Sequence, residues 1–230
     1  SRYGFTPDSW EISLEPDTSS ASWSASQIAQ AIKAAGDRLQ ANGFTPRFVA
    51  PSVTDAANAA SYIDQIAQTP GAMNYVMEFS YHRYGGASSG VLQAIASRAA
   101  TYNKQTAMLE WIGAGYEELH NDLKTGRNSS WQQFTLAFPN EPDNGAQYFI
   151  ISDANPNNPQ ITMGSRTRFL RQYFKYVRTG AQRIEASTGD FNFDPVAFIN
   201  ADGKYVVVVA ASTGGSFTVQ GLPAGTYGIK

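Results

Sequence analysis

Residues 106–112 read Thr-Ala-Met-Leu-Glu-Trp-Ile, a largely apolar run that carries one carboxylate, Glu110. A short apolar run of this kind is typical of a strand buried on both faces of a parallel sheet. A helical pattern follows at about 116–124. The apolar run and the helical pattern together predict one strand-helix unit with an acidic side chain near the carboxyl end of its strand.

Four similar units surround this one along the chain. We expect strands at 10–15, 48–50, 75–81 and 130–138, followed by helices at about 24–43, 54–68, 91–102 and 166–177. Ser24 and Gln27 have the spacing of a capping box, and Thr54 is the candidate N-cap of the next helix. Strict alternation of strands and helices predicts an α/β fold with a parallel sheet.

The pattern changes to strands alone after Arg183. Strand signals at 196–199, 205–211, 216–219 and 226–229 are separated by Gly, Asp and Ser turns, which predicts part of a small β-sandwich. We therefore expect two domains, residues 1–180 and 181–230. The segment 139–160, rich in Asn, Pro and Asp, is too long for an ordinary connection, and we expect it to shape the rim of a site.

The composition narrows the class of protein. The chain has 17 Lys+Arg against 19 Asp+Glu, so it has no basic field to attract nucleic acid or an anionic membrane. Its 13% aromatic content disfavours disorder, and the lack of cysteine excludes a disulfide-stapled miniprotein. Only 16% of residues are charged, against about 25% in an average protein, which favours a secreted or periplasmic carbohydrate-active protein.

Glu15 ends the first predicted strand, and Glu110 lies near the end of the fourth. Functional groups of parallel barrels gather at the carboxyl ends of the strands, and two carboxylates facing one cleft suit glycoside hydrolysis, although phosphate and metal sites use similar positions. Glu78 lies inside the third strand, where its side chain could point into a barrel or toward the helices. No spacing indicates a metal site and no loop has a phosphate-binding pattern, so we expect no metal and no cofactor.

An ordered set of motifs gives the chain a resemblance. The chain is similar to the C-terminal part of clan A retaining glycoside hydrolases, nearest to families such as 30 and 39 that join a (β/α)₈ barrel to a side β-sandwich. The motifs that carry the resemblance are WEISLEPD (10–17), SYHRYGG (80–86), AMLEWIG (107–113), NSSWQQF (128–134), RFLRQYFKYVRTGAQRI (168–184) and AFINADGKYVVVVAAS (197–212).

The resemblance implies strands four to eight of a TIM barrel, followed by part of the sandwich. A full barrel takes about 250 residues, whereas about 180 precede the sandwich signals here. We therefore expect an incomplete barrel, completed by the N-terminal half of the same enzyme as a separate chain or a symmetry partner.

The resemblance also implies roles for particular residues. Glu15 would be the general acid/base and Glu110 the nucleophile that forms a covalent glycosyl-enzyme, with carboxyl groups about 5 to 5.5 Å apart. Tyr84 would hydrogen-bond the nucleophile, and His82 would line the sugar-binding cleft, although a core histidine is the plainer alternative. No activity-related role is expected for His120 and Asp122, which we predict to lie on a solvated helix face.

Aromatic residues complete the expected site. Trp131 would stack under the sugar, with barrel packing as an equally weighted alternative, and Trp111 is a weaker candidate for the same role. Leu14 departs from the family, which has an Asn before the acid/base Glu to contact the sugar 2-hydroxyl. The leading hypothesis is a retaining glycosidase acting on an oligo- or polysaccharide. A catalytically silent carbohydrate-binding relative and a lyase that uses Glu110 as a base remain as alternatives.

Overall fold

We describe a computed structural model of the chain, covering residues 4–18, 20, 22–113, 115–139, 142–143, 145–152 and 155–230. The chain divides into two compact units, which are described separately. The first contains the described residues of Ser1–Ile112 together with Asn121–Phe134. The second contains those of Gly113–His120 and Thr135–Lys230.

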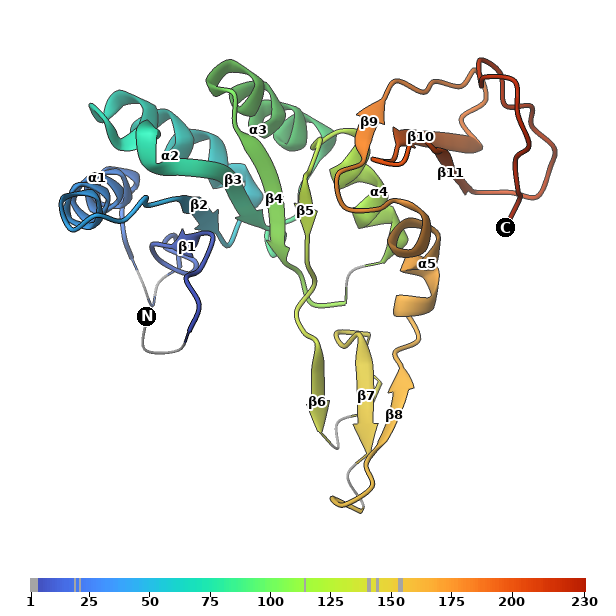
Figure 1. Ribbon diagram of the computed structural model, residues 1–230, viewed down its shortest axis with the longest axis horizontal. Coiled ribbons are helices and arrows are strands. Elements are labelled where there is room, and N and C mark those ends of the chain that lie inside the picture. Colours follow the sequence, from blue (N-terminus) through green and yellow to red (C-terminus); the bar gives the residue numbers. More distant parts are fainter. Residues whose placement is uncertain are drawn as a thin grey trace. The chain divides into compact units, whose positions relative to one another are not determined.

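The first unit is built on a five-stranded sheet in the order β1-β2-β3-β4-β5 (Figure 1). Every pairing in it is parallel, and the order in space equals the order along the chain. Parallel neighbours require crossover connections, here mostly helical, so the α/β prediction is confirmed. The strands are β1 (Trp10–Glu11), β2 (Phe48–Val53), β3 (Val76–His82), β4 (Gln105–Glu110) and β5 (Ser130–Trp131).

Helices connect the strands, and Figure 1 shows α1, α2 and α3 along one side of the sheet. Their bounds are α1 (Ala25–Ala41), α2 (Ala56–Gln68), a 3-10 turn η1 (Ala72–Tyr75), α3 (Ser89–Tyr102) and α4 (Tyr116–Lys124). The capping box of Ser24 and Gln27 is confirmed. The N-cap of α2 is Asp55, whose side chain accepts from the Ala57 amide, and not the predicted Thr54.

The core of the first unit lies between the helices and the sheet. It contains the fully buried side chains of Ile32, Ile63 and Ile66 from the helices and of Phe79 and Tyr81 from β3. Five consecutive residues of β3, Glu78–His82, are buried. Because successive side chains alternate between the faces of a strand, both faces of β3 are covered at this point.

The described residues of the second unit include two small sheets, helix α5 and the first part of α4. One sheet has the order β6-β7-β8 and the other the order β11-β10-β9. Their members are β6 (Ala137–Pro139), β7 (Phe149–Ser152), β8 (Gln160–Met163), β9 (Gln182–Ile184), β10 (Phe193–Ile199) and β11 (Tyr205–Ala211), with helix α5 (Thr167–Tyr176) between β8 and β9.

Four strand predictions differ from the structure. The strand expected at 10–15 is limited to Trp10–Glu11, so Glu15 lies in the loop after β1. Residues 130–138 do not form one strand: β5 stops at Trp131 and β6 begins at Ala137. Residues 216–219 and 226–229 form no strand, and most of this stretch is exposed. Gly214 and Gly215 precede this stretch and Gly221 and Pro223 interrupt it, and short apolar runs without a hydrogen-bonded neighbour do not form strands. Within the described part of the chain, no helix combines the length and the apolar character needed to span a bilayer.

Candidate active site

The loop after β1 carries Glu15 in an unusual backbone conformation. Its φ is +46°, in the left-handed region that a non-glycine residue adopts at a cost of roughly 1 kcal/mol or more. The Glu15 amide donates to the Ser52 carbonyl at 3.1 Å, and Ser52 at the end of β2 also has a positive φ of +54°. The hydrogen bond to Ser52 holds the Glu15 backbone next to the end of β2.

Asp17 anchors the same loop to the start of α2. Its carboxylate accepts hydrogen bonds from the Thr54 amide at 2.6 Å, the Asp55 amide at 3.2 Å and the Asn58 side chain at 2.8 Å. Burial alone would raise the pKa of Asp17, but these hydrogen bonds outweigh it and lower the pKa below its usual value. The loop that presents Glu15 is therefore held by an ionised side chain two residues away.

The end of β3 supplies a partner for each predicted carboxylate. His82, buried at 1% exposure, has its Nδ1 2.9 Å from Glu15 Oε1. The Tyr84 hydroxyl donates to Glu110 Oε1 at 2.7 Å. Burial, followed by the hydrogen bond to Glu110 and the charges of Glu110 and Glu15, raises the pKa of Tyr84 above its usual value, so this phenol remains a donor.

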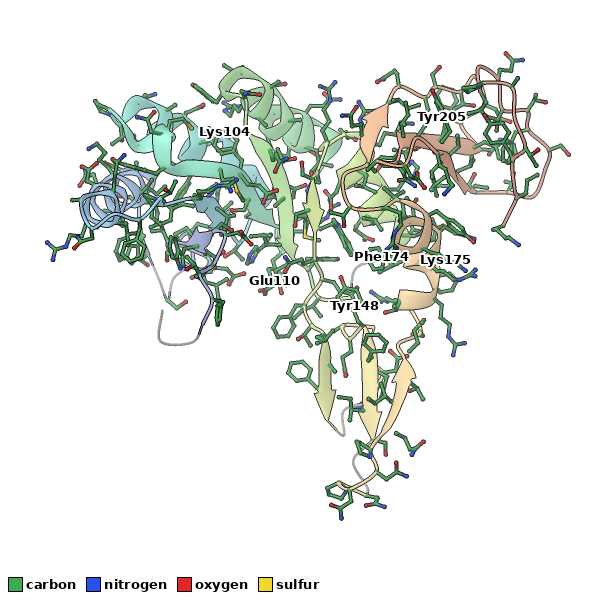
Figure 2. The ribbon with its side chains drawn as sticks, in the orientation of Figure 1. Lys104, Glu110, Tyr148, Phe174, Lys175 and Tyr205 are labelled. Atoms are coloured by element: carbon green, nitrogen blue, oxygen red, sulfur yellow. The ribbon has the colours of Figure 1, made fainter. Side chains whose placement is uncertain are left out.

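Glu15, His82 and Glu110 converge at one point. A carboxylate oxygen of each glutamate and a ring nitrogen of His82 all lie within 4.8 Å of one another. Glu110 ends β4, in register with His82 of β3. Figure 2 shows Glu110 at one end of β4, with Lys104 at the other. These three side chains are also the group among the described residues whose donor atoms could hold a metal ion, although His82 and Tyr84 already engage the two carboxylates.

A cavity of about 410 Å³ opens beside this cluster. Its lining comes from the five strands of the sheet, from residues directly next to them and from Leu14 in the loop after β1, and consists of Ser9, Glu11, Leu14, Val49, Glu78, His82, Leu109, Glu110, Ser130 and Gln132. The Glu78 side chain lies on the cavity side of β3. The sequence had left open which way this side chain points. Burial raises the pKa of Glu78. The lining includes three glutamates and neither lysine nor arginine, so the cavity is acidic.

The turn after Tyr84 requires glycine. Gly86 has a φ of +83°, a conformation that glycine adopts without strain. A Cβ atom on Gly85 would collide with the Asp55 carboxyl group that caps α2. The Gly85–Gly86 pair thus lets the end of β3 pack closely against the start of α2.

The predicted tryptophans lie beside the cluster in different ways. The Trp111 ring packs on Tyr84 with ring centroids 5.4 Å apart. Trp131 packs against the hydrophobic core, and its indole N–H donates to Asp122 Oδ2 at 2.9 Å. Its neighbours Ser130 and Gln132 line the cavity, as alternation along a strand requires when Trp131 faces the other way. The stacking role of either ring stays a prediction.

The prediction that His120 and Asp122 lie on a solvated helix face is wrong. His120 is 2% exposed in the second unit, where its ring contacts Tyr173. Asp122 is completely buried in the first unit, where it accepts hydrogen bonds from Arg83 at 2.6 Å and from Tyr81 at 2.7 Å. The i, i+3 spacing of Leu119 and Asp122 was the available signal, since it places Asp122 on the apolar side of α4.

Comparison with known proteins gives one family match and several similar folds. Residues 180–221 match the model of the glycosyl hydrolase family 30 beta sandwich domain. No curated protein matches the sequence.

Three solved structures share the fold across 90% of this chain. The catalytic domain of GH30 xylanase C from Talaromyces cellulolyticus has 18% identity and a TM-score of 0.73 over 50% of its own chain. SrfJ from Salmonella typhimurium has 16% identity and a TM-score of 0.77 over 51% of its chain. A conserved exported protein from Bacteroides fragilis has 16% identity and a TM-score of 0.66 over 55% of its chain.

The chain therefore spans about half the length of the solved structures that it matches. The sequence match is confined to residues 180–221, whereas the structural likeness covers 90% of the chain. The chain resembles the C-terminal portion of a family 30 glycoside hydrolase.

Proposed function

We propose that the protein is a retaining glycoside hydrolase that cleaves β-glycosidic bonds in an oligo- or polysaccharide outside the cytoplasm. The observation that carries the proposal is the approach of Glu15 and Glu110, since one oxygen of each carboxylate and a ring nitrogen of His82 lie within 4.8 Å of one another. Retaining enzymes hold their two carboxyl groups about 5–5.5 Å apart, whereas inverting enzymes leave about 6.5–9.5 Å for a water molecule. The close pair favours direct attack by one carboxylate.

The reaction has two steps in this proposal. The Glu110 carboxylate attacks the anomeric carbon while Glu15 protonates the glycosidic oxygen, so the bond to the leaving sugar breaks and a glycosyl ester forms on Glu110. Glu15, now ionised, then takes a proton from water as the water attacks the anomeric carbon. Cleavage of the ester restores the Glu110 carboxylate and leaves Glu15 protonated.

The neighbouring side chains orient these two groups. Tyr84 holds Glu110 Oε1 by its hydroxyl, which leaves Oε2 of the same carboxylate for attack. His82, buried and 2.9 Å from Glu15 Oε1, fixes the acid/base in the rotamer that faces Glu110. Positioning of this kind lowers the barrier because the reacting groups need not be ordered during the reaction.

We also propose that further strands of the same protein complete the sheet as a barrel. The chain spans about half of the structures that share its fold, and its cavity opens on the face of the sheet where Glu11, Glu78 and Glu110 are exposed to it. Strands at this face would exclude water from the acidic lining. Assays of activity should therefore use the full-length protein.

The test is a pair of variants in the full-length protein. Glu110→Gln should abolish hydrolysis of activated aryl β-glycosides, since the nucleophile is lost. Glu15→Ala should also be slow, and azide should restore a glycosyl azide product by attacking the intermediate on Glu110. The screen includes xylan, because one protein of this fold is named a xylanase. Unchanged activity in either variant would refute the assignment.

One observation favours a second function, a carbohydrate-binding relative that no longer hydrolyses. Leu14, directly before Glu15, lines the cavity and is 56% exposed, so this position offers a sugar no hydrogen bond from its side chain. Oligosaccharide binding without turnover on a broad panel of glycosides would support that function. Turnover that depends on Glu110 would exclude it.

A further inference from the structure

A buried ion pair lies behind the end of β3. Arg83 stands between His82 and Tyr84, whose side chains contact the two carboxylates. The Arg83 side chain instead binds Asp122 of α4, with Nη1 2.6 Å from Oδ1. The side chain of Asp122 is 0% exposed and that of Arg83 is 8% exposed.

Asp122 connects more than one strand. Its Oδ1 also accepts a hydrogen bond from the Tyr81 hydroxyl of β3 at 2.7 Å, and its Oδ2 accepts from the Trp131 indole of β5 at 2.9 Å. In the sheet, β3 and β5 are the two neighbours of β4, which ends at Glu110. One carboxylate on α4 thus ties together both strands that flank the strand of the predicted nucleophile.

Arg83 is held through its backbone as well. Its amide donates to the Glu110 carbonyl at 3.3 Å, and the following amide, of Tyr84, donates to the Thr54 carbonyl at 3.1 Å. A shift of Arg83 would therefore move His82 and Tyr84 together, and with them the hydrogen bonds to Glu15 and Glu110. Loss of one member of a buried ion pair leaves an uncompensated charge, which drives such a shift.

We propose that Asp122 is a positioning residue of the active site: it clamps Arg83, and through Arg83 it sets the places of His82 and Tyr84 against the two carboxylates. The inference rests on the proposed function, because it assigns a part in hydrolysis to a side chain that does not contact the cavity. It predicts that the Arg83–Asp122 pair affects kcat in addition to stability.

The test is a double-mutant cycle in the full-length protein, with Asp122→Asn, Arg83→Gln and the double variant. The control cycle uses Asp64→Asn and Arg98→Gln. Arg98 donates from Nε and Nη2 to Asp64, both at 2.7 Å, in a partly exposed pair between α3 and α2. All variants are assayed for kcat and KM at a temperature where each is folded.

Asp122→Asn and Arg83→Gln should each lower kcat by about ten- to hundredfold, the effect expected for a displacement of up to about 1 Å, with a smaller change in KM. The double variant should be no slower than the slower single variant, because both break the same clamp. The control cycle should shift Tm without changing kcat by more than twofold. A kcat within twofold of wild type in both single variants would overturn the inference.

A second readout does not depend on turnover. The ring-nitrogen resonances of His82, assigned with a His82→Gln variant, report its hydrogen bond to Glu15. The chemical shifts of these nitrogens should change in Asp122→Asn and Arg83→Gln and should be unchanged in the control variants. If the wild-type protein hydrolyses no glycoside, the proposed function fails, and this readout alone decides the inference. Unmoved His82 resonances would then overturn it.

Discussion

The hydroxyl of Tyr84 is the one hydrogen-bond donor among the described side chains that the structure aims at Glu110. Tyr84→Phe removes this hydrogen bond and keeps the ring that packs on Trp111. A hydrogen bond to a charged group contributes about 1.5–3 kcal/mol, so we expect kcat/KM to fall by roughly ten- to hundredfold.

The matched control for this prediction is Tyr75→Phe. The Tyr75 hydroxyl also donates to a carboxylate, Asp37, at 2.7 Å, but on the exposed side of α1. Steady-state kinetics of both variants checks the prediction. Equal activity in the two variants would show that the Tyr84 hydrogen bond has no part in the reaction.

The sequence alone predicts which residues form the charged cluster, but it does not predict which side chains hold them in position. Glu15, His82, Tyr84 and Glu110 lie at or near the carboxyl ends of predicted strands. Because those ends meet at one edge of a parallel sheet, the convergence of these residues follows from topology. The partners of Asp122 depend on side-chain packing between α4 and the sheet. Periodicity reports which side of a helix is apolar, and a lone polar residue on that side gives no sign of its partner.

At the scale of elements, Asp17 ties the loop after β1 to the start of α2. Asp17→Asn keeps the shape of the side chain and removes its charge, so hydrogen bonds from two amides and Asn58 weaken. We expect a loss of about 1–2 kcal/mol in the free energy of unfolding at neutral pH. Because the Glu15 loop loosens, kcat should fall as well.

The pH dependence of this loss has a definite sign. The folded-state pKa of Asp17 is lowered, so its stabilisation is present above the unfolded-state pKa and is lost as the pH falls through the folded-state pKa. Thermal unfolding at a series of pH values should show wild type and Asp17→Asn converging in acid. The control is Asp202→Asn in an exposed turn, for which we expect a small effect at every pH. A constant gap between wild type and Asp17→Asn would contradict the role of the charge.

Local signals explain which elements could be predicted. The capping box at Ser24 and the run Tyr205–Ala211 are strong local patterns, and the structure confirms both. The strands predicted at 216–219 and 226–229 are absent because strand formation needs a neighbouring strand, which a local pattern does not report. The three short strands β7, β8 and β9 carry weak local signals and depend on their pairing.

At the scale of the whole molecule, the effect of a Glu78 substitution on stability tests whether further strands cover the cavity. It is 6% exposed and lines the cavity, and burial raises its pKa. Among the described residues, none is hydrogen-bonded to its carboxyl group. If a further strand of the barrel supplies a cationic partner for Glu78, Glu78→Gln leaves that buried cation without a counter-ion. We then expect Tm of the full-length protein to fall at pH 7.

A rise in Tm for Glu78→Gln would have a different cause. A buried glutamate without a partner stabilises the fold only while it is protonated, so its stabilisation is lost as the pH rises through its raised pKa. Glu78→Gln would then raise Tm at high pH and leave it unchanged in acid. That result, from unfolding curves between about pH 4 and 9, would show that no cationic side chain reaches Glu78. Glu185→Gln, at an exposed site, serves as the control.

In the proposed reaction, Glu110 attacks the sugar and carries it covalently. The most direct measurement is mass spectrometry of the full-length protein after incubation with activated 2-deoxy-2-fluoro β-glycosides, which form the glycosyl ester and release it slowly. We predict a mass increase of one fluorosugar, on the peptide that contains Glu110, and no such adduct in Glu110→Gln. Hydrolysis of the parent glycosides without an adduct, or with an adduct on another residue, would show that Glu110 is not the nucleophile.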